Sequence, residues 1–387
     1  MITSLKKKNL GVGLVGLKKN YFTLSFQILI LWGLLLITML WFSDPGVASA
    51  YDGEEEYLRG EVQQVEDLDT PRAGEIKQEA VVEVSSGEHK GKETSITHYY
   101  RQMDLYGVYL LEGMEVILVD MGEEFGEEVL LHDVARDRGV YILLGLFIVL
   151  LLAVGRSRGA KALLMLAFMG FFIVRVLLPL VLRGYNPIWI SVITGVILVT
   201  VTLLVIVGWN QKSISAIGGT VTGLLIAGFL ALWTGGMSHL TGFSSEEAQM
   251  LFYFAPDINI RDLLFAGIII GALGAMIDVG ISVSSAAAEL KETKPDISIA
   301  ALTTGAMNVG RDVMATMANT MILAYVGAAI PLLLFISGMD MPWIRIINMD
   351  LIATEIVRGI SISVGIVVTV PVTALLAGLL MGSKEVK

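Results

Sequence analysis

Runs of about 20 apolar residues recur along this chain of 387 residues and limit its fold more than any other feature. At about 1.5 Å per residue, a helix of that length spans the hydrocarbon core of a bilayer. A bilayer offers no partners to backbone polar groups, so such runs are expected to be helices. They cover 21–42, 139–154, 160–182, 187–208, 213–234, 262–284, 310–337 and 351–380. The sequence therefore predicts an α-helical polytopic membrane bundle of about eight transmembrane helices.

Residues 1–20 contain five lysines and precede the first apolar run, 21–42. Lysines before a span hold that end of the chain in the cytoplasm. We therefore expect 1–20 to be a cytoplasmic basic N-terminus and 21–42 to be a retained anchor, because the run is longer than the apolar core of a signal peptide. Ala48-Ser49-Ala50 resembles a cleavage site, so a cleaved signal peptide is the alternative.

Residues 44–138 differ in character from the rest of the chain. They hold 24 Asp and Glu against 8 Lys and Arg, which leaves the remainder of the chain with a net charge of +6. Short alternating runs at 80–84, 95–100 and 115–119 are separated by turns that contain glycine and predict antiparallel strands. We expect a small, acidic, extracytoplasmic β domain between the first two spans. Its charge argues against a nucleic-acid partner.

Residues 139–382 are expected to form a seven-helix membrane domain. Alternate loops carry the basic residues Arg156, Arg158, Lys161, Lys212, Lys291 and Lys294, while the other short loops carry fewer. By the positive-inside rule, the basic loops and both termini lie in the cytoplasm.

Polar residues recur at helical spacing within 261–325. On the first helix, Gly267, Gly271, Gly274, Asp278 and Ser282 share one face. Glycines at this spacing let helices approach closely, and an ionisable group in a membrane helix is expected to turn toward the interior of the bundle.

A second helix of the same stretch carries Asn308, Arg311, Asp312 and Asn319. We expect these residues to join Asp278 and Ser282 in an intramembrane polar cluster, with Asp278 paired to Arg311. The segment from 297 to 337 would be about 60 Å long as one helix, so it must bend, and Gly305 and Gly310 are the predicted hinges.

A second group of charges lies toward the outer ends of the spans. It contains both signs, and we expect Arg175 to pair with Glu355 or Asp262 beside Arg358.

The segments GALGAMIDVGISVSSAAAEL (271–290) and TTGAMNVGRDVMATMANTMILAYVG (303–327) resemble the signature of the YibE/F family of bacterial multi-pass membrane proteins. The resemblance implies a polytopic protein of the bacterial cell membrane with an extracytoplasmic domain. It implies no chemistry and no catalytic residue.

These features favour a secondary transporter or permease that moves a small solute or ion through a polar path lined by the sixth, seventh and eighth helices. The alternative is a non-enzymatic assembly protein whose β domain binds a membrane or extracytoplasmic protein. No HExxH or GxSxG motif is present, so we expect no enzyme. The chain has no Cys and only four His, and we expect neither cofactor nor metal. The expected partners are the lipid bilayer and a small solute or ion.

Overall fold

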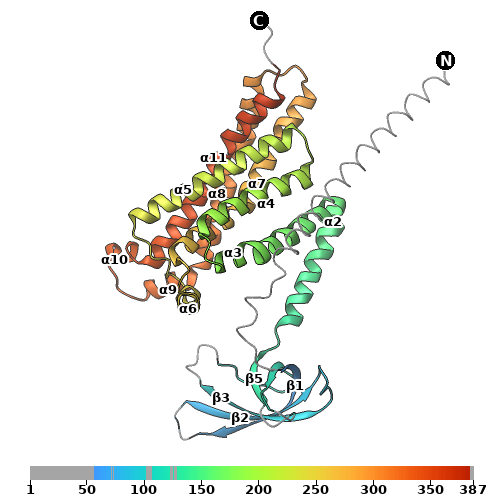
Figure 1. Ribbon diagram of the computed structural model, residues 1–387, viewed down its shortest axis with the longest axis vertical. Coiled ribbons are helices and arrows are strands. Elements are labelled where there is room, and N and C mark those ends of the chain that lie inside the picture. The colour runs from blue at the N-terminus through green and yellow to red at the C-terminus, as the bar shows by residue number, and fades with distance from the viewer. Residues whose placement is uncertain are drawn as a thin grey trace, which may run out of the picture. The chain divides into compact units, whose positions relative to one another are not determined.

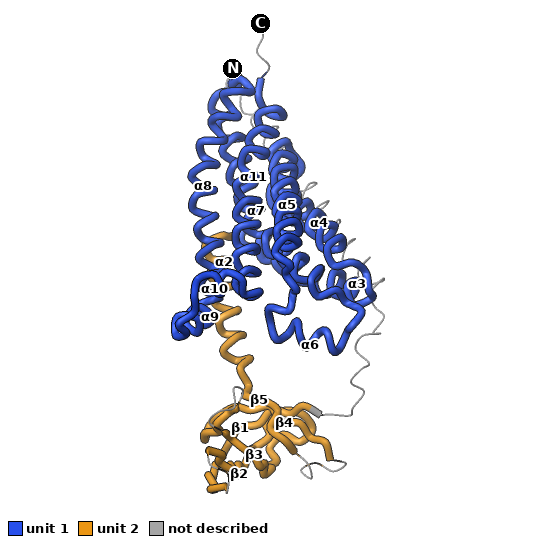
Figure 2. Tube along the Cα trace, turned by 90° about the vertical axis from the view of Figure 1, so that its left-hand side faces the viewer, with its two compact units in different colours: residues 1–44, 157–387 blue, residues 45–156 orange. Residues whose placement is uncertain are grey.

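The computed structural model describes residues 56–70, 72, 74–101, 107–122, 125 and 129–383. The predicted basic terminus 1–20 and the predicted anchor 21–42 lie outside these ranges. The chain divides into two compact units, Pro45–Arg156 and a second that joins Met1–Asp44 to Ser157–Lys387 (Figure 2).

The first unit contains one antiparallel sheet of five strands with the order β3-β2-β1-β4-β5. The sheet curls into a partly open barrel, since a bulge between Val62 and Gln64 bends β1 and brings β3 and β5 close together. This is the strand order of an OB-fold barrel. The predicted antiparallel sheet is present, and its three predicted strands lie within β2, β3 and β4. The strands are β1 (Glu56–Asp69), β2 (Glu75–Val84), β3 (Glu93–Arg101), β4 (Glu115–Asp120) and β5 (Val129–Val134).

The rest of the described chain is helical (Figure 1). The elements are α2 (Asp137–Phe172), the π-helical turn η2 (Ile173–Leu177), α3 (Leu178–Leu182), α4 (Pro187–Val207), α5 (Gln211–Met237), α6 (Glu246–Phe254), α7 (Ile260–Thr293), α8 (Ile299–Ala328), α9 (Ile330–Ser337), α10 (Trp343–Ile347) and α11 (Asp350–Met381).

Five helical stretches in the described part of the chain are long and apolar enough to cross a membrane, or six if the bent pair α8 and α9 is one span. One of them, Asp137–Leu182, has 46 residues, about twice the length that one crossing needs. Its helical backbone is interrupted at Arg156, which has a φ of 47°. This interruption lies between the two predicted spans 139–154 and 160–182.

The bundle is built around α7, which contacts α4, α5, α8 and α11. Its wide apolar face, which includes Ile268, Ala272, Met276 and Val283, is buried in the core. Beside it, α5 and α11 pack so closely that a Cβ on Gly223 would clash with Thr369 and would lie 2.7 Å from the carbonyl oxygen of Gly365. Glycine is therefore needed there to bring the two backbones together.

The predicted hinge at Gly305 and Gly310 is wrong. Both residues lie inside the continuous helix α8, where a Cβ on Gly305 would lie 2.6 Å from Leu290 and one on Gly310 would clash with Val370. These glycines serve helix packing. The expected bend instead falls at Ala329, where α8 and α9 meet at 60°. Pro331 explains its position, because proline is tolerated in the first turn of a helix but not in its interior.

Candidate functional site

One face of α7 carries a continuous row of small and polar residues, which we call the α7 stripe. It is defined by Gly267, Gly271, Gly274, Asp278, Ser282, Ser285, Glu289 and Glu292, spaced three or four residues apart. The first four are exposed and Ser282 and Ser285 are half-buried. The predicted residues therefore do share one face of α7. The expectation that this face turns into the interior of the bundle is wrong for the described chain, because the apolar face of α7 is buried there instead.

The glycines of the stripe also differ from expectation. A Cβ on Gly267 or Gly274 would have no neighbour within 4 Å, so neither residue is needed for helix packing in the described chain. Gly271 is different, because its Cβ would lie 3.4 Å from the hydroxyl oxygen of Tyr325 on α8.

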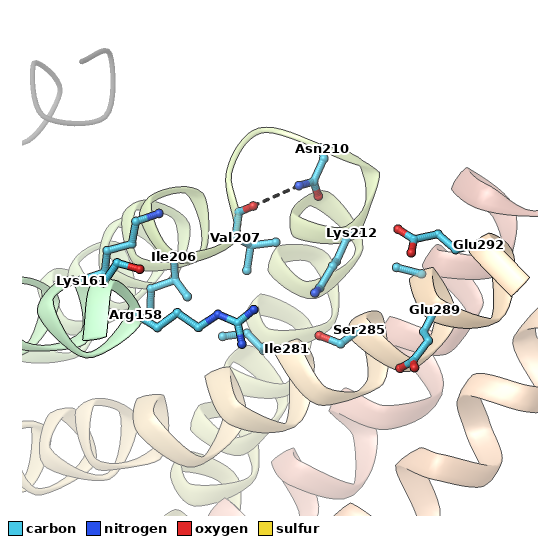
Figure 3. A pocket seen from close by; sticks show the side chains of 12 residues that line it. Arg158, Lys161, Ile206, Val207, Asn210, Lys212, Ile281, Ser285, Glu289 and Glu292 are labelled. Carbon is cyan, nitrogen blue, oxygen red and sulfur yellow. Dashed lines mark hydrogen bonds between the residues drawn. The ribbon is translucent and has the colours of Figure 1, made fainter. Parts of the chain in front are cut away.

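The basic end of the bundle contains a polar cavity of about 860 Å³ (Figure 3). The end of the α7 stripe forms one wall, with Ser285, Glu289 and Glu292. In Figure 3 the side chains of Arg158 and Lys212 enter the cavity from α2 and α5 and point toward the wall that holds Ser285. Both signs of charge therefore line the cavity. Its polar lining consists of Ser157, Arg158, Lys161, Asn210, Lys212, Ser285, Glu289 and Glu292.

Asp278 lies on the stripe about two helical turns from Ser285. The hydroxyl of Ser282 donates to the backbone carbonyl of Asp278 at 2.8 Å, so it does not bind the carboxylate. Within the described residues, the Asp278 carboxylate has no hydrogen bond or ion pair. It is a carboxylate that remains available to a proton, a cation or another protein group.

The predicted pair between Asp278 and Arg311 is not formed. Arg311 donates to Asn308 Oδ1 at 2.9 Å, within α8. The four predicted polar residues of α8, Asn308, Arg311, Asp312 and Asn319, are all exposed. The buried residues of this helix, Leu302, Ala306 and Gly310, lie on its opposite face. The α8 group therefore points away from the bundle.

The predicted outer cluster is only partly assembled. Glu355 and Arg358 form an ion pair at 2.7 Å within α11. Asp262 instead accepts a hydrogen bond of 2.9 Å from Asn186. Arg175 is exposed and forms no ion pair with either carboxylate, so the expected pairing of Arg175 with Glu355 or Asp262 is wrong.

Tyr325 connects the outer cluster to the α7 stripe, and sequence reasoning missed it. Its ring lies 5.9 Å from the Arg358 guanidinium, while its hydroxyl lies against Gly271. The sequence did contain a signal, because Tyr325 is the last tyrosine of the chain and follows the polar run of α8 within an apolar segment. The structure thus places Gly271, Tyr325, Arg358 and Glu355 in one chain of contacts.

No curated protein and no solved structure matches the chain. The family model of the YibE/F-like proteins matches residues 143–383, which include α4 to α11 and the whole α7 stripe. This match covers more than half of the sequence and both segments that carry the resemblance. The chain therefore belongs to the YibE/F-like protein family.

Proposed function

We propose that this protein is a secondary transporter or permease for a small solute or ion, and that the α7 stripe is the centre of its path. The observation that carries the proposal is the continuity of the stripe. From Glu292 and Glu289 in the polar cavity it continues through Ser285 and Ser282 to Asp278. Polar groups on a membrane helix are costly unless they meet water, solute or protein.

The proposed path is open at the cavity and closed at its other end. Asp278 binds a proton or cation and couples it to the solute. Beyond it, the Tyr325 hydroxyl lies beside the stripe at Gly271, where it forms the proposed closure, and the Tyr325 ring contacts Arg358, which pairs with Glu355. The proposed path is lined by α7 and closed by α8 and α11, whereas the sequence predicts that all three helices line it. The outward-facing residues Asn308, Arg311, Asp312 and Asn319 do not line it within one chain.

The proposal includes a membrane topology. We place the basic cavity on the cytoplasmic side of the bacterial cell membrane, because Arg158, Lys161 and Lys212 gather there. Eight spans then follow if 21–42 is an anchor, the stretch 137–182 crosses twice and α8 with α9 crosses once. Both termini are cytoplasmic and the β domain is extracytoplasmic.

Flux through purified protein tests the proposal. The full chain in proteoliposomes is expected to dissipate an imposed proton or cation gradient, and Asp278→Asn should lower the rate by at least about tenfold. The matched control is Asp296→Asn, since Asp296 is an exposed aspartate in the linker between α7 and α8. Equal rates for the two variants, or no flux under any gradient, would rule out the proposed path.

The β domain supports a second candidate function, that of an assembly protein that binds an extracytoplasmic partner. Tyr57 and Leu130 are 54% and 44% exposed and lie in one row across the sheet, since each pairs with Val119. Exposed aromatic and aliphatic side chains on a sheet face supply contact area to a protein partner. In cells that depend on the protein, this function predicts loss of activity for Tyr57→Ser with Leu130→Ser, and normal activity for Asp278→Asn. The transporter predicts the reverse.

A further inference from the structure

Helix α8 is poorly covered by the rest of the bundle. Of its 30 residues only Leu302, Ala306 and Gly310 are buried, and all three lie in its first half. Figure 2 shows α8 at the edge of the helical unit, next to α11. On its outer face Arg311, Asp312, Ala315 and Asn319 are exposed, while Ile322 and Val326 line an apolar cavity of about 400 Å³ together with residues of α10 and α11.

That outer face has a regular pattern, which we call the α8 seam. It consists of six exposed residues: Asn308, Asp312, Ala315, Asn319, Ile322 and Val326. Their spacing alternates between four and three residues, a mean of 3.6, so the six residues lie along one face of the helix. Polar groups on a face that met lipid alone would have no hydrogen-bond partner.

Lipid is a poor cover for the seam. Asp312 is 13 residues after the start of α8, or about 20 Å along the helix, and follows Gly310, where a Cβ would lie 3.1 Å from Val283 of α7. An aspartate, an arginine and two asparagines on the exposed side of a membrane helix would each need a polar partner that acyl chains do not supply. Protein contact supplies one, and Ala315 lets another helix approach closely.

The charges of the α8 seam indicate which protein would contact it. All copies of the chain insert into the membrane in the same direction, so a two-fold axis along the membrane normal brings equal residues of two copies to equal depth. In parallel knobs-into-holes packing, the hole for Asp312 is formed by the partner's Asn308, the partner's Arg311, the partner's Asp312 and the partner's Ala315. Adjacent residues of opposite charge are what such a symmetric contact requires.

We propose that two copies of this chain associate through the α8 seam, with Asp312 of each copy paired to Arg311 of the other. Asn308 and Asn319 each face their own counterparts across the axis, where side-chain amides can both donate and accept. The face is self-complementary, because it carries one charge of each sign. A different protein would need a matching arrangement that nothing in this chain specifies. The proposal is independent of the transport path, which lies on α7.

Disulfide cross-linking in native membranes tests the interface, because the chain has no cysteine of its own. In the full-length protein, Ala315→Cys lies on the seam and should form a covalent dimer under mild oxidation. The matched control is Ala324→Cys, an exposed alanine on the same helix that lies on the far side from the seam. We expect at least about tenfold more dimer from Ala315→Cys. Equal yields, no dimer from Ala315→Cys, or an adduct with another protein would overturn the proposal.

Charge reversal in the Ala315→Cys background identifies the partner. Asp312→Arg alone, or Arg311→Asp alone, places like charges opposite each other and should lower the dimer yield by about tenfold. The double variant Arg311→Asp with Asp312→Arg should restore the yield, because both copies change together. A heterologous partner would keep its own charges, so failure of the double variant to restore cross-linking would also refute the two-fold interface.

Discussion

The side-chain amide of Asn186 donates a hydrogen bond of 2.9 Å to Asp262, and this contact joins the first turn of α4 to the first turn of α7. Asn186 also caps its own helix, since its Oδ1 accepts from the backbone amides of Ile188 and Trp189 at 3.0 and 3.2 Å. Asn259 caps α7 through the backbone amide of Asp262 at 3.1 Å. Two helix N-termini are therefore fixed to each other at one end of the bundle.

Substitutions of Asn186 and Asn259 should distinguish the stability contributed by a helix cap from the stability contributed by the hydrogen bond between α4 and α7. We expect Asn186→Ala to lower the free energy of unfolding by about 1–3 kcal/mol, because it removes a cap and a hydrogen bond to a charged group. Asn259→Ala removes a cap alone and should cost about 1 kcal/mol. Thermal unfolding in detergent, followed by helical circular dichroism, compares the two. An equal loss for both variants would mean that the contact with Asp262 contributes nothing.

Gly223→Ala and Gly274→Ala make the same chemical change but should differ in their effect on the free energy of unfolding. Gly223→Ala places a methyl group against Thr369 and the Gly365 carbonyl, so we expect a loss of about 1–3 kcal/mol in the free energy of unfolding. Gly274→Ala meets nothing within 4 Å and should be neutral or slightly stabilising, since alanine is the better helix former. Denaturant unfolding of both variants in one detergent measures the difference. A larger loss for Gly274→Ala would show that another element covers the stripe.

The β domain should lose stability in acid through Asp67. Hydrogen bonds from Tyr109 and from Gln78, the latter at 2.8 Å, lower the pKa of Asp67 below its ordinary value of 3.8. The folded domain thus holds the ionised form, so the contribution is complete above the unfolded pKa and is lost as the pH falls below about 4. Unfolding of the full chain, followed by near-ultraviolet circular dichroism of the tyrosines, should show a larger loss toward acid in the natural sequence than in Asp67→Asn. Parallel profiles would remove Asp67 as the cause.

Tyr325 should control access to the α7 stripe from the outer side. In the cysteine-free chain, Gly274→Cys provides one thiol on the stripe, and a membrane-impermeant maleimide reports the side from which it is reached. We expect labelling from the cytoplasmic side alone. Addition of Tyr325→Ala, which removes the cover at Gly271, should permit labelling from the outer side. Addition of Tyr325→Phe keeps the ring against Arg358 and serves as the control. Outer labelling without any change at Tyr325 would contradict the proposed closure.

The strands and most of the helices could be predicted because their signals are local. The alternation at 80–84 and the apolar runs at 187–208 and 351–380 each specify an element without reference to the rest of the chain. The bend in the long segment after 297 was predicted from length alone, but its position was not. Gly305 and Gly310 are the flexible residues, yet they lie against Leu290 and Val370, and the bend falls beside Pro331.

The polar faces show the limit of sequence reasoning most clearly. Spacing correctly placed Asp278 with Ser282, and Asn308 with Asp312, on shared helix faces, because the α-helical period is fixed by the backbone. Spacing does not determine whether a helix face is buried or exposed. In the interior of the bundle, α5 and α11 pack closely through Gly223 and Thr369, and the apolar face of α7 is buried beside them.

The sequence by itself determined a set of apolar helices, an acidic β domain and two polar stripes, since each of these depends on residues close together in the chain. The tertiary structure alone decided that both stripes face outward and that Tyr325 joins Gly271 to Arg358. The physical reason is that burial is a competition among all faces of all helices. The widest apolar faces and the helix pairs with the closest glycine contacts are buried in the core of the bundle. The polar faces remain on the outside, where they can meet water, solute or a second chain.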